Sequence, residues 1–116
     1  MISRASILDR LSALADQTRS RILLLLYRHE LTVGELCAGL QLPQSTVSRH
    51  LKILSDDGWI IARGEGTSRF YSMEPSRLDP SAKRVWQVVR EPLGSVVGAA
   101  QGARGVGGGL AQPARR

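Results

Sequence analysis

The sequence has little cysteine, few aromatic residues and no long apolar run. Its single cysteine, Cys37, excludes an intramolecular disulfide. Aromatic residues make up only 4% of the chain, so leucine, valine, isoleucine and alanine must supply most of the core. The apolar run at residues 23–27 is far too short to cross a bilayer, and no signal-peptide pattern is present. We therefore expect a soluble, cytoplasmic protein that does not contact a membrane.

Catalytic motifs are missing as well. The sequence shows no nucleophile beside a base, no phosphate-binding glycine loop after a strand, and no carboxylate pair at a plausible pocket. The glycine-rich residues 105–109 follow no strand and precede no helix, so they do not form a dinucleotide-binding motif. These observations indicate a binding protein rather than an enzyme, and no cofactor is expected.

The charge of the chain agrees with a polyanionic partner but does not establish one. The formal net charge is +6, which favours partners such as DNA. Residues 102–116 contain three arginines and no acidic residue, which leaves 13 basic and 10 acidic residues in residues 1–101. With 116 residues the chain can form one domain with a modest core, and the folded part is only mildly basic.

Two short helices with a tight break between them are predicted over residues 31–54. Thr32 suits the cap of the first helix, and Glu35 three residues later completes a capping box. Residues 41–43 break the chain. Pro43 is expected at the first position of the second helix, where its missing N–H has no partner in any case.

The second of these helices has a polar outer side. At 100° per residue, Val47, Leu51 and Leu54 fall within roughly 60° of one another and form the predicted buried side. Hydroxyl groups, an amide and basic side chains occupy the rest, with almost no acid before Asp56. This side can approach phosphates and base edges, although an ordinary solvated helix would show the same pattern.

A basic β-hairpin is predicted next. Gly58 is expected to end the preceding helix in a left-handed conformation. Residues 59–63 and 68–73 are rich in aromatic and β-branched residues and are predicted to be two strands joined by a loop over residues 64–67. Arg63 and Arg69 flank the tip, from which they could reach phosphates or a minor groove. An exposed hairpin without a ligand is the alternative.

Two helices are predicted before this region. The first covers residues 3–15, and the second covers residues 17–28 after the capping residue Asp16. The second helix is apolar nearly all round, so it is the expected centre of the core. Arg19 and Arg21 near its start are either phosphate contacts or ordinary solvated arginines.

A last helix is predicted after the hairpin. It begins at Asp79-Pro80 and is expected to be firm to about Glu91. Pro92 and the glycines that follow oppose helix, at about 1 kcal/mol per glycine and about 3 kcal/mol for proline. A kinked or frayed continuation to about residue 103, and disorder after it, are therefore expected.

The order of these residues resembles the winged helix-turn-helix regulators of the ArsR/SmtB family. The resemblance runs through residues 14–23, 31–40, 42–54 and 56–73, about two-thirds of the chain. It implies a mainly α fold with a two-stranded antiparallel β wing, over residues 1–91, with residues 92–116 as an extension and flexible tail. It also implies a homodimeric DNA-binding regulator, most often a repressor on a palindromic operator, whose inducer the sequence does not identify.

The resemblance implies a set of DNA contacts. Arg49 is the best candidate for reading a guanine. The expected base contacts are Gln44, Ser45, Ser48 and Arg49; the expected recognition-helix contacts to the DNA backbone are Thr46 and Lys52; and the expected wing contacts are Arg63, Thr67 and Arg69.

The dimer interface is also implied by the resemblance. In the family the first helix and the helix after the wing form the dimer, and a small chain gains buried surface by dimerising. The expected interface residues are Ile7, Leu11, Val85, Trp86 and Val89. The alternative is that this surface packs only on its own domain.

Metal-sensing sites known in the family are not matched. The usual cysteine positions of one site fall at Thr32, Gly34 and Cys37, of which only the last is cysteine. A lone thiolate does not supply the three or four ligands that soft metals prefer. A second site needs histidine in the last helix, and residues 80–101 contain none. We predict no metal and a buried, structural Cys37; oxidative pairing of two Cys37 residues across a dimer remains open.

Two other functions remain open at this point. Residues 16–23, 42–54 and 85–91 look particularly like members of the family that are fused to an S-adenosylmethionine-dependent methyltransferase, and no such domain follows within these 116 residues. A regulatory or oligomerisation module of a separate or lost methyltransferase is therefore the alternative. A winged helix that binds a protein partner is the third reading.

Overall fold

The computed structural model describes the backbone of residues 7–103 and the side chains of residues 7–95. Within that part the chain is mainly helical, with a small antiparallel sheet. The elements in order are α1 (Ile7–Leu14), α2 (Gln17–Arg28), β1 (Leu31–Thr32), α3 (Val33–Leu40), α4 (Gln44–Asp56), β2 (Ile61–Glu65), β3 (Ser68–Ser72), the 3-10 turn η1 (Pro75–Arg77) and α5 (Pro80–Ala103).

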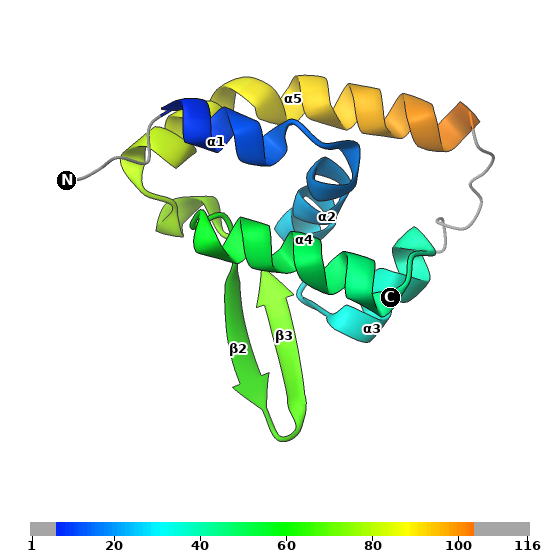
Figure 1. The fold of residues 1–116 in the computed structure, drawn as a ribbon. Coiled ribbons are helices and arrows are strands. Elements are labelled where there is room, and N and C mark those ends of the chain that lie inside the picture. Colours follow the sequence, from blue (N-terminus) through cyan, green and yellow to red (C-terminus); the bar gives the residue numbers. More distant parts are fainter. Residues whose placement is uncertain (1–6, 104–116) are drawn as a thin grey trace.

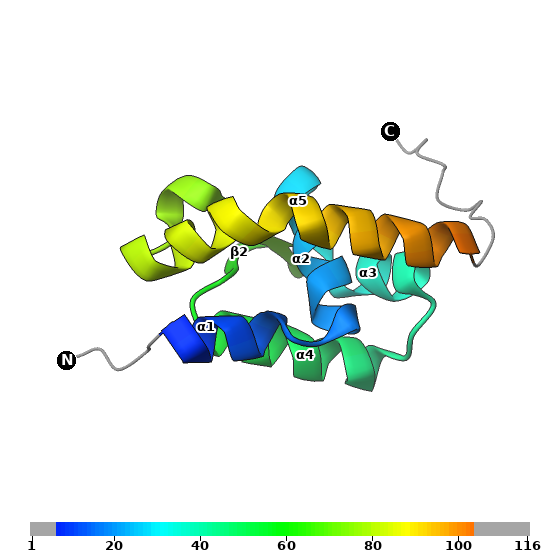
Figure 2. The same ribbon diagram turned by 90° about the horizontal axis from the view of Figure 1, so that it is seen from above.

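The helices are arranged around α2. In Figure 1, α1 and α5 form the upper layer, α2 lies beneath them, and α4 with α3 forms the lower layer. Figure 2, the view from above, shows α1 and α5 both toward the viewer, with part of α2 between them. The hairpin of β2 and β3 projects from the lower layer, away from α1 and α5. The predicted recognition helix and wing therefore lie on the side opposite the two helices predicted to form the dimer.

Local capping signals determine where several helices begin. The Asp16 side chain accepts a hydrogen bond from the backbone N–H of Arg19 at 3.0 Å, as predicted for the start of α2. Thr32 and Glu35 form the predicted capping box of α3. The prediction for Pro43 was wrong by one position. Its ψ of 154° is extended, so Pro43 is the residue before α4 rather than its first helical residue.

The sheet has three strands, so the predicted two-stranded wing was incomplete. Besides the hairpin of β2 and β3, the short strand β1 pairs antiparallel with β3, with Leu31 opposite Tyr71 and Thr32 opposite Phe70. Thr32 has the extended backbone that an N-cap requires, and this same conformation lets it join a strand. The sheet therefore connects the wing to the start of α3.

The hairpin loop is also shorter than predicted. Gly64 and Glu65 belong to β2 and pair with Arg69 and Ser68, which leaves Gly66 and Thr67 as a two-residue turn. Gly66 has a φ of +63°, the left-handed conformation that such hairpin turns require. Gly58 likewise has the predicted left-handed conformation, with a φ of +79°, just after α4.

The core combines aliphatic side chains with two tryptophans. Ile22, Leu23 and Leu26 of α2 are almost completely buried, which confirms this helix as the centre of the domain. Trp59 lies just before β2 rather than in a strand, and it is 1% exposed. The other tryptophan, in α5, meets the Tyr27 ring edge-on with ring centroids 5.2 Å apart.

Helix α5 continues past Pro92 to Ala103, the limit expected for its continuation. The division of the chain at residue 91 therefore falls inside a helix, and it remains a prediction. The disorder predicted after residue 103 concerns residues outside the described part of the chain. None of the helices described here is long and apolar enough to cross a membrane.

Candidate DNA-binding surface

Helix α4 presents the predicted buried and exposed sides. Val47, Leu51 and Leu54 are buried, and His50 joins them with only 7% of its surface exposed. Thr46 is half-buried at the edge. The remaining predicted residues of this helix are all exposed and lie on one side of it: Gln44, Ser45, Ser48, Arg49 and Lys52.

The two basic side chains on this side differ in their partners. The Lys52 ammonium lies 3.1 Å from an Asp56 carboxylate oxygen, and both side chains are mostly exposed. An exposed pair of this kind contributes little to stability, so Lys52 can exchange Asp56 for a phosphate at small cost. Arg49 has no ion-pair partner among the described residues and is exposed. Its guanidinium is therefore available to an acceptor outside the protein.

The wing arginines also differ. Arg63 donates to both carboxylate oxygens of Glu30 at 2.7 and 2.9 Å and to Glu65 at 3.0 Å, and it stacks on the Phe70 ring at 4.9 Å. These hydrogen bonds raise the pKa of Arg63 above its ordinary value, and the bond with Arg63 lowers the pKa of Glu30. The two glutamates already neutralise Arg63, so its predicted phosphate contact would require it to leave them.

Arg69 differs from Arg63 in its surroundings. It is exposed on β3 opposite Gly64 and makes no ion pair within the described part of the chain. Thr67, the second residue of the turn, is exposed beside it. Arg69 and Thr67 therefore present a free guanidinium and a hydroxyl at the tip of the hairpin.

Arg19 is neither a solvated arginine nor free to bind a phosphate. Its Nε donates to the Ala13 carbonyl at 2.6 Å, one Nη donates to the Ser12 carbonyl at 3.4 Å, and the other lies 3.2 Å from Nδ1 of His50. Because an arginine only donates, Nδ1 of His50 must accept this hydrogen bond. Arg19 thus attaches the end of α1 to the recognition helix and requires a neutral His50.

Protonation of His50 should therefore destabilise the fold. Burial lowers the pKa of His50, and Arg19 and Arg49 lower it further, against the opposing effect of Asp16. Below its ordinary value of about 6.5, the unfolded chain takes up a proton that the folded protein does not. The free energy of unfolding is therefore expected to fall as pH decreases from about 6.5.

Urea unfolding of the wild-type protein and of two variants at pH 7.5, 6.5 and 5.5 tests this expectation. His50→Gln should flatten the pH dependence over this range. His29→Gln, which replaces the other histidine of the chain at an exposed position, should preserve it. An equal decrease in the wild-type and His50→Gln proteins would show that another group is responsible.

The residues predicted for a dimer interface differ in burial: two are buried, one is half-buried, and Ile7 and Leu11 are exposed. Val85 and Trp86 are 4% and 1% exposed and belong to the core of the single protomer, so they have little surface to offer a second copy. Val89 is half-buried. Four of the five exposed large apolar side chains in the described part of the chain lie on the adjacent helices α1 and α5; we call these the α1–α5 patch: Ile7, Leu8, Leu11 and Val88.

Cys37 is half-buried rather than fully buried, and it packs against the core. Within the described residues, no three His, Cys, Asp or Glu side chains are grouped so that they could hold a metal ion. The predicted full burial of Cys37 was therefore wrong, although the side chain does pack against the core.

Comparison with known proteins gives concordant matches. The model of the family described as bacterial regulatory protein, arsR family, matches residues 16–61. The transcriptional activator HlyU of Vibrio cholerae is 40% identical over 68 residues, which span 59% of this chain and 63% of HlyU. The transcriptional regulator CmtR of Mycobacterium tuberculosis is 41% identical over 87 residues, 74% of each chain.

A solved structure agrees with these matches. The transcriptional regulator HlyU from Vibrio vulnificus superimposes with a TM-score of 0.59 at 36% identity, covering 76% of this chain and 85% of that one. The similarity therefore extends beyond the helix-turn-helix to most of the fold.

Proposed function

The chain belongs to the ArsR family of bacterial regulatory proteins, and from this premise we propose that it is a homodimeric repressor that binds a palindromic operator. The observation that carries the proposal is the exposed side of α4. Five of the six residues expected there to contact DNA are exposed, while the opposite side of the helix is buried in the core.

In this proposal each protomer inserts α4 into a major groove. Half-sites then lie about one helical turn, roughly 34–36 Å, apart. Gln44, Ser45, Ser48 and Arg49 read base edges, whereas Thr46 and Lys52 bind the backbone. Arg69 and Thr67 of the wing add contacts to phosphates or to the neighbouring minor groove.

The proposed dimer forms through the α1–α5 patch. Large apolar side chains exposed on two adjacent helices are typical of a surface that a partner covers. In a two-fold dimer the same patch of each protomer contacts its counterpart. Because α4 and the wing lie on the opposite side of the fold, they remain free to contact DNA.

Selection of DNA fragments by the purified protein tests the proposal. Genomic fragments are incubated with the protein, and the bound ones are recovered and sequenced through several rounds. We expect enrichment of a palindrome with half-sites one turn apart. No enrichment above nonspecific binding would contradict the proposal, and it would favour a winged helix that serves another module or a protein partner.

The salt dependence of binding should distinguish the two wing arginines. Arg69→Ala is expected to weaken binding to all sequences and to reduce the slope of log K against log salt by about one unit, because one phosphate contact is lost. Arg63→Ala should change the slope less, since Glu30 and Glu65 already neutralise Arg63. Titrations of a labelled duplex at several salt concentrations measure both slopes. An unchanged slope for Arg69→Ala would contradict a phosphate contact by the wing.

A further inference from the structure

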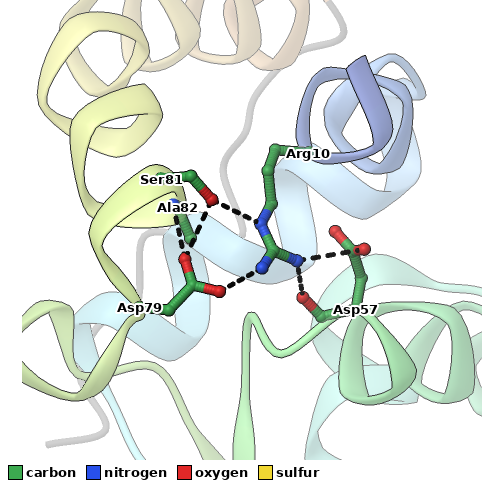
Figure 3. A network of polar contacts seen from close by, with 5 residues as sticks. All are labelled: Arg10, Asp57, Asp79, Ser81 and Ala82. Carbon is green, nitrogen blue, oxygen red and sulfur yellow. Dashed lines mark hydrogen bonds and ion pairs between the residues drawn. The ribbon is translucent and has the colours of Figure 1, made fainter. Parts of the chain in front are cut away.

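Arg10 is a buried arginine at the junction of three helices. It lies on α1, and only 5% of its surface is exposed. Figure 3 shows its guanidinium between Asp57, which follows the last residue of α4, and Asp79 and Ser81 at the beginning of α5. Taking a charged side chain out of water is costly unless each of its donors finds a partner.

Each side of the guanidinium has a partner. One Nη donates to the backbone carbonyl of Asp57 and lies 3.1 Å from a carboxylate oxygen of the same residue. The other Nη donates to the Asp79 carboxylate, and Nε donates to the Ser81 hydroxyl at 3.2 Å. The rigid, planar fork of arginine can make these contacts at once, whereas a lysine ammonium is a single point of charge.

The partners of Arg10 are themselves fixed to the helix ends. The second carboxylate oxygen of Asp79 accepts hydrogen bonds from the backbone N–H of Ala82 at 2.9 Å and from Ser81 at 3.0 Å, and so it caps α5. Asp57 caps the other helix, since its N–H donates to the Ile53 carbonyl at 3.1 Å. Arg10 therefore links the start of α5 to the end of α4.

This link joins the two functional sides of the proposed regulator. Helices α1 and α5 carry the exposed α1–α5 patch, and α4 carries the DNA-binding side. A buried guanidinium with partners on each side favours one arrangement of the elements that supply them, because another arrangement would leave a buried charge unpaired. Oδ2 of Asp57, by contrast, is buried without a hydrogen-bond partner.

We propose that Arg10 is a positioning residue that fixes α4 relative to α1 and α5, and thereby sets the half-site spacing that the dimer accepts. This inference rests on the proposed function, because spacing has a meaning only for a dimer on two half-sites. Arg10 itself touches no DNA, and it acts through the geometry of the helices it connects.

The test compares the wild-type protein with Arg10→Lys on operators whose half-sites are moved apart or together by one or two base pairs. Lysine retains the charge but cannot bridge Asp57, Asp79 and Ser81 together. Joining two half-sites raises affinity by about 10²- to 10⁴-fold only if the geometry permits both to be engaged. We expect Arg10→Lys to lose on the order of tenfold on the natural spacing and to discriminate less between spacings. Binding to a single half-site should stay within about twofold of the wild-type value, because α4 itself is unaltered.

Two further variants keep the test decisive. Asp57→Asn weakens the ion pair but retains the carbonyl contact, so it loosens the α4 end alone and should relax the spacing preference as well. Arg77→Lys is the matched control, since Arg77 is exposed in η1 with Glu74 4.0 Å away; it should behave as wild type. Thermal unfolding identifies the variants that are folded at the assay temperature. If Arg10→Lys is unfolded at that temperature, the spacing preference of Asp57→Asn tests the positioning role instead.

The outcomes separate the inference from the proposed function. Folded variants that keep the wild-type spacing preference would overturn the positioning role and leave the proposed function intact. A wild-type protein without any preference for paired half-sites would overturn the proposed function itself.

Discussion

Replacing Leu8 and Val88 together by glutamate is expected to give a folded monomer that binds the operator weakly. These side chains are 72% and 73% exposed, so the substitution removes little from the core of the protomer. In a dimer they would place charges in an apolar interface, where an unpaired charge is strongly unfavourable. A monomer engages one half-site at a time, and we expect a loss of about 10²- to 10⁴-fold in operator affinity.

Light scattering gives the oligomeric state of this variant, and titration of a labelled operator gives its affinity. The control carries two glutamates at exposed positions on α3 and η1, Ala38→Glu with Ser76→Glu, so that the added charge is the same. The control should remain a dimer. A dimeric Leu8→Glu, Val88→Glu protein would show that the α1–α5 patch is not the interface.

Arg49→Ala is expected to remove recognition of one base pair. Arginine binds the O6 and N7 of guanine with two hydrogen bonds, and the loss of such a pair costs roughly 1–3 kcal/mol. Arg49 is suited to this role because it is exposed on α4 and, within the described residues, has no ion-pair partner to leave.

The measurement uses a set of operators in which each base pair is replaced in turn. Replacing one particular base pair should lower the affinity of the wild-type protein and leave the affinity of Arg49→Ala unchanged. Lys52→Ala is the control, and it should weaken binding to every duplex by a similar factor. A loss for Arg49→Ala that is equal on operator and random DNA would make Arg49 a phosphate contact.

The features that could be predicted from the sequence depend on residues close together in the chain. Asp16 and the pair Thr32 and Glu35 cap their helices through contacts three residues apart, and Gly58 ends α4 in the expected conformation. The buried side of α4 follows from helical periodicity. The exposed positions of α4 follow from the same periodicity, since the other side of the helix must then face outward.

The features that could not be predicted depend on tertiary contacts. Arg10 and Asp79 are 69 positions apart, and Arg63 and Glu30 are 33 apart, so no local pattern indicates that they meet. The pairing of β1 with β3 likewise joins residues that are far apart in the chain, so no local pattern predicts it.

The buried side of helix α5 could not be predicted from its sequence either. Its apolar residues occupy more than one side, and their spacing does not say which side faces the protomer core. Trp86 was consequently predicted at a dimer interface, whereas it is buried in its own protomer. Val88, two residues further along the same helix, is exposed instead.

Sequence-specific reading of DNA by α4 is tested most directly by the ratio of two affinities. The wild-type protein is titrated against the selected palindrome and against a duplex of the same length and composition in scrambled order, at one fixed salt concentration. Specific DNA-binding proteins prefer their sites by at least about 10³-fold. A ratio of about this size is the expected result, and a ratio near one would contradict the central claim.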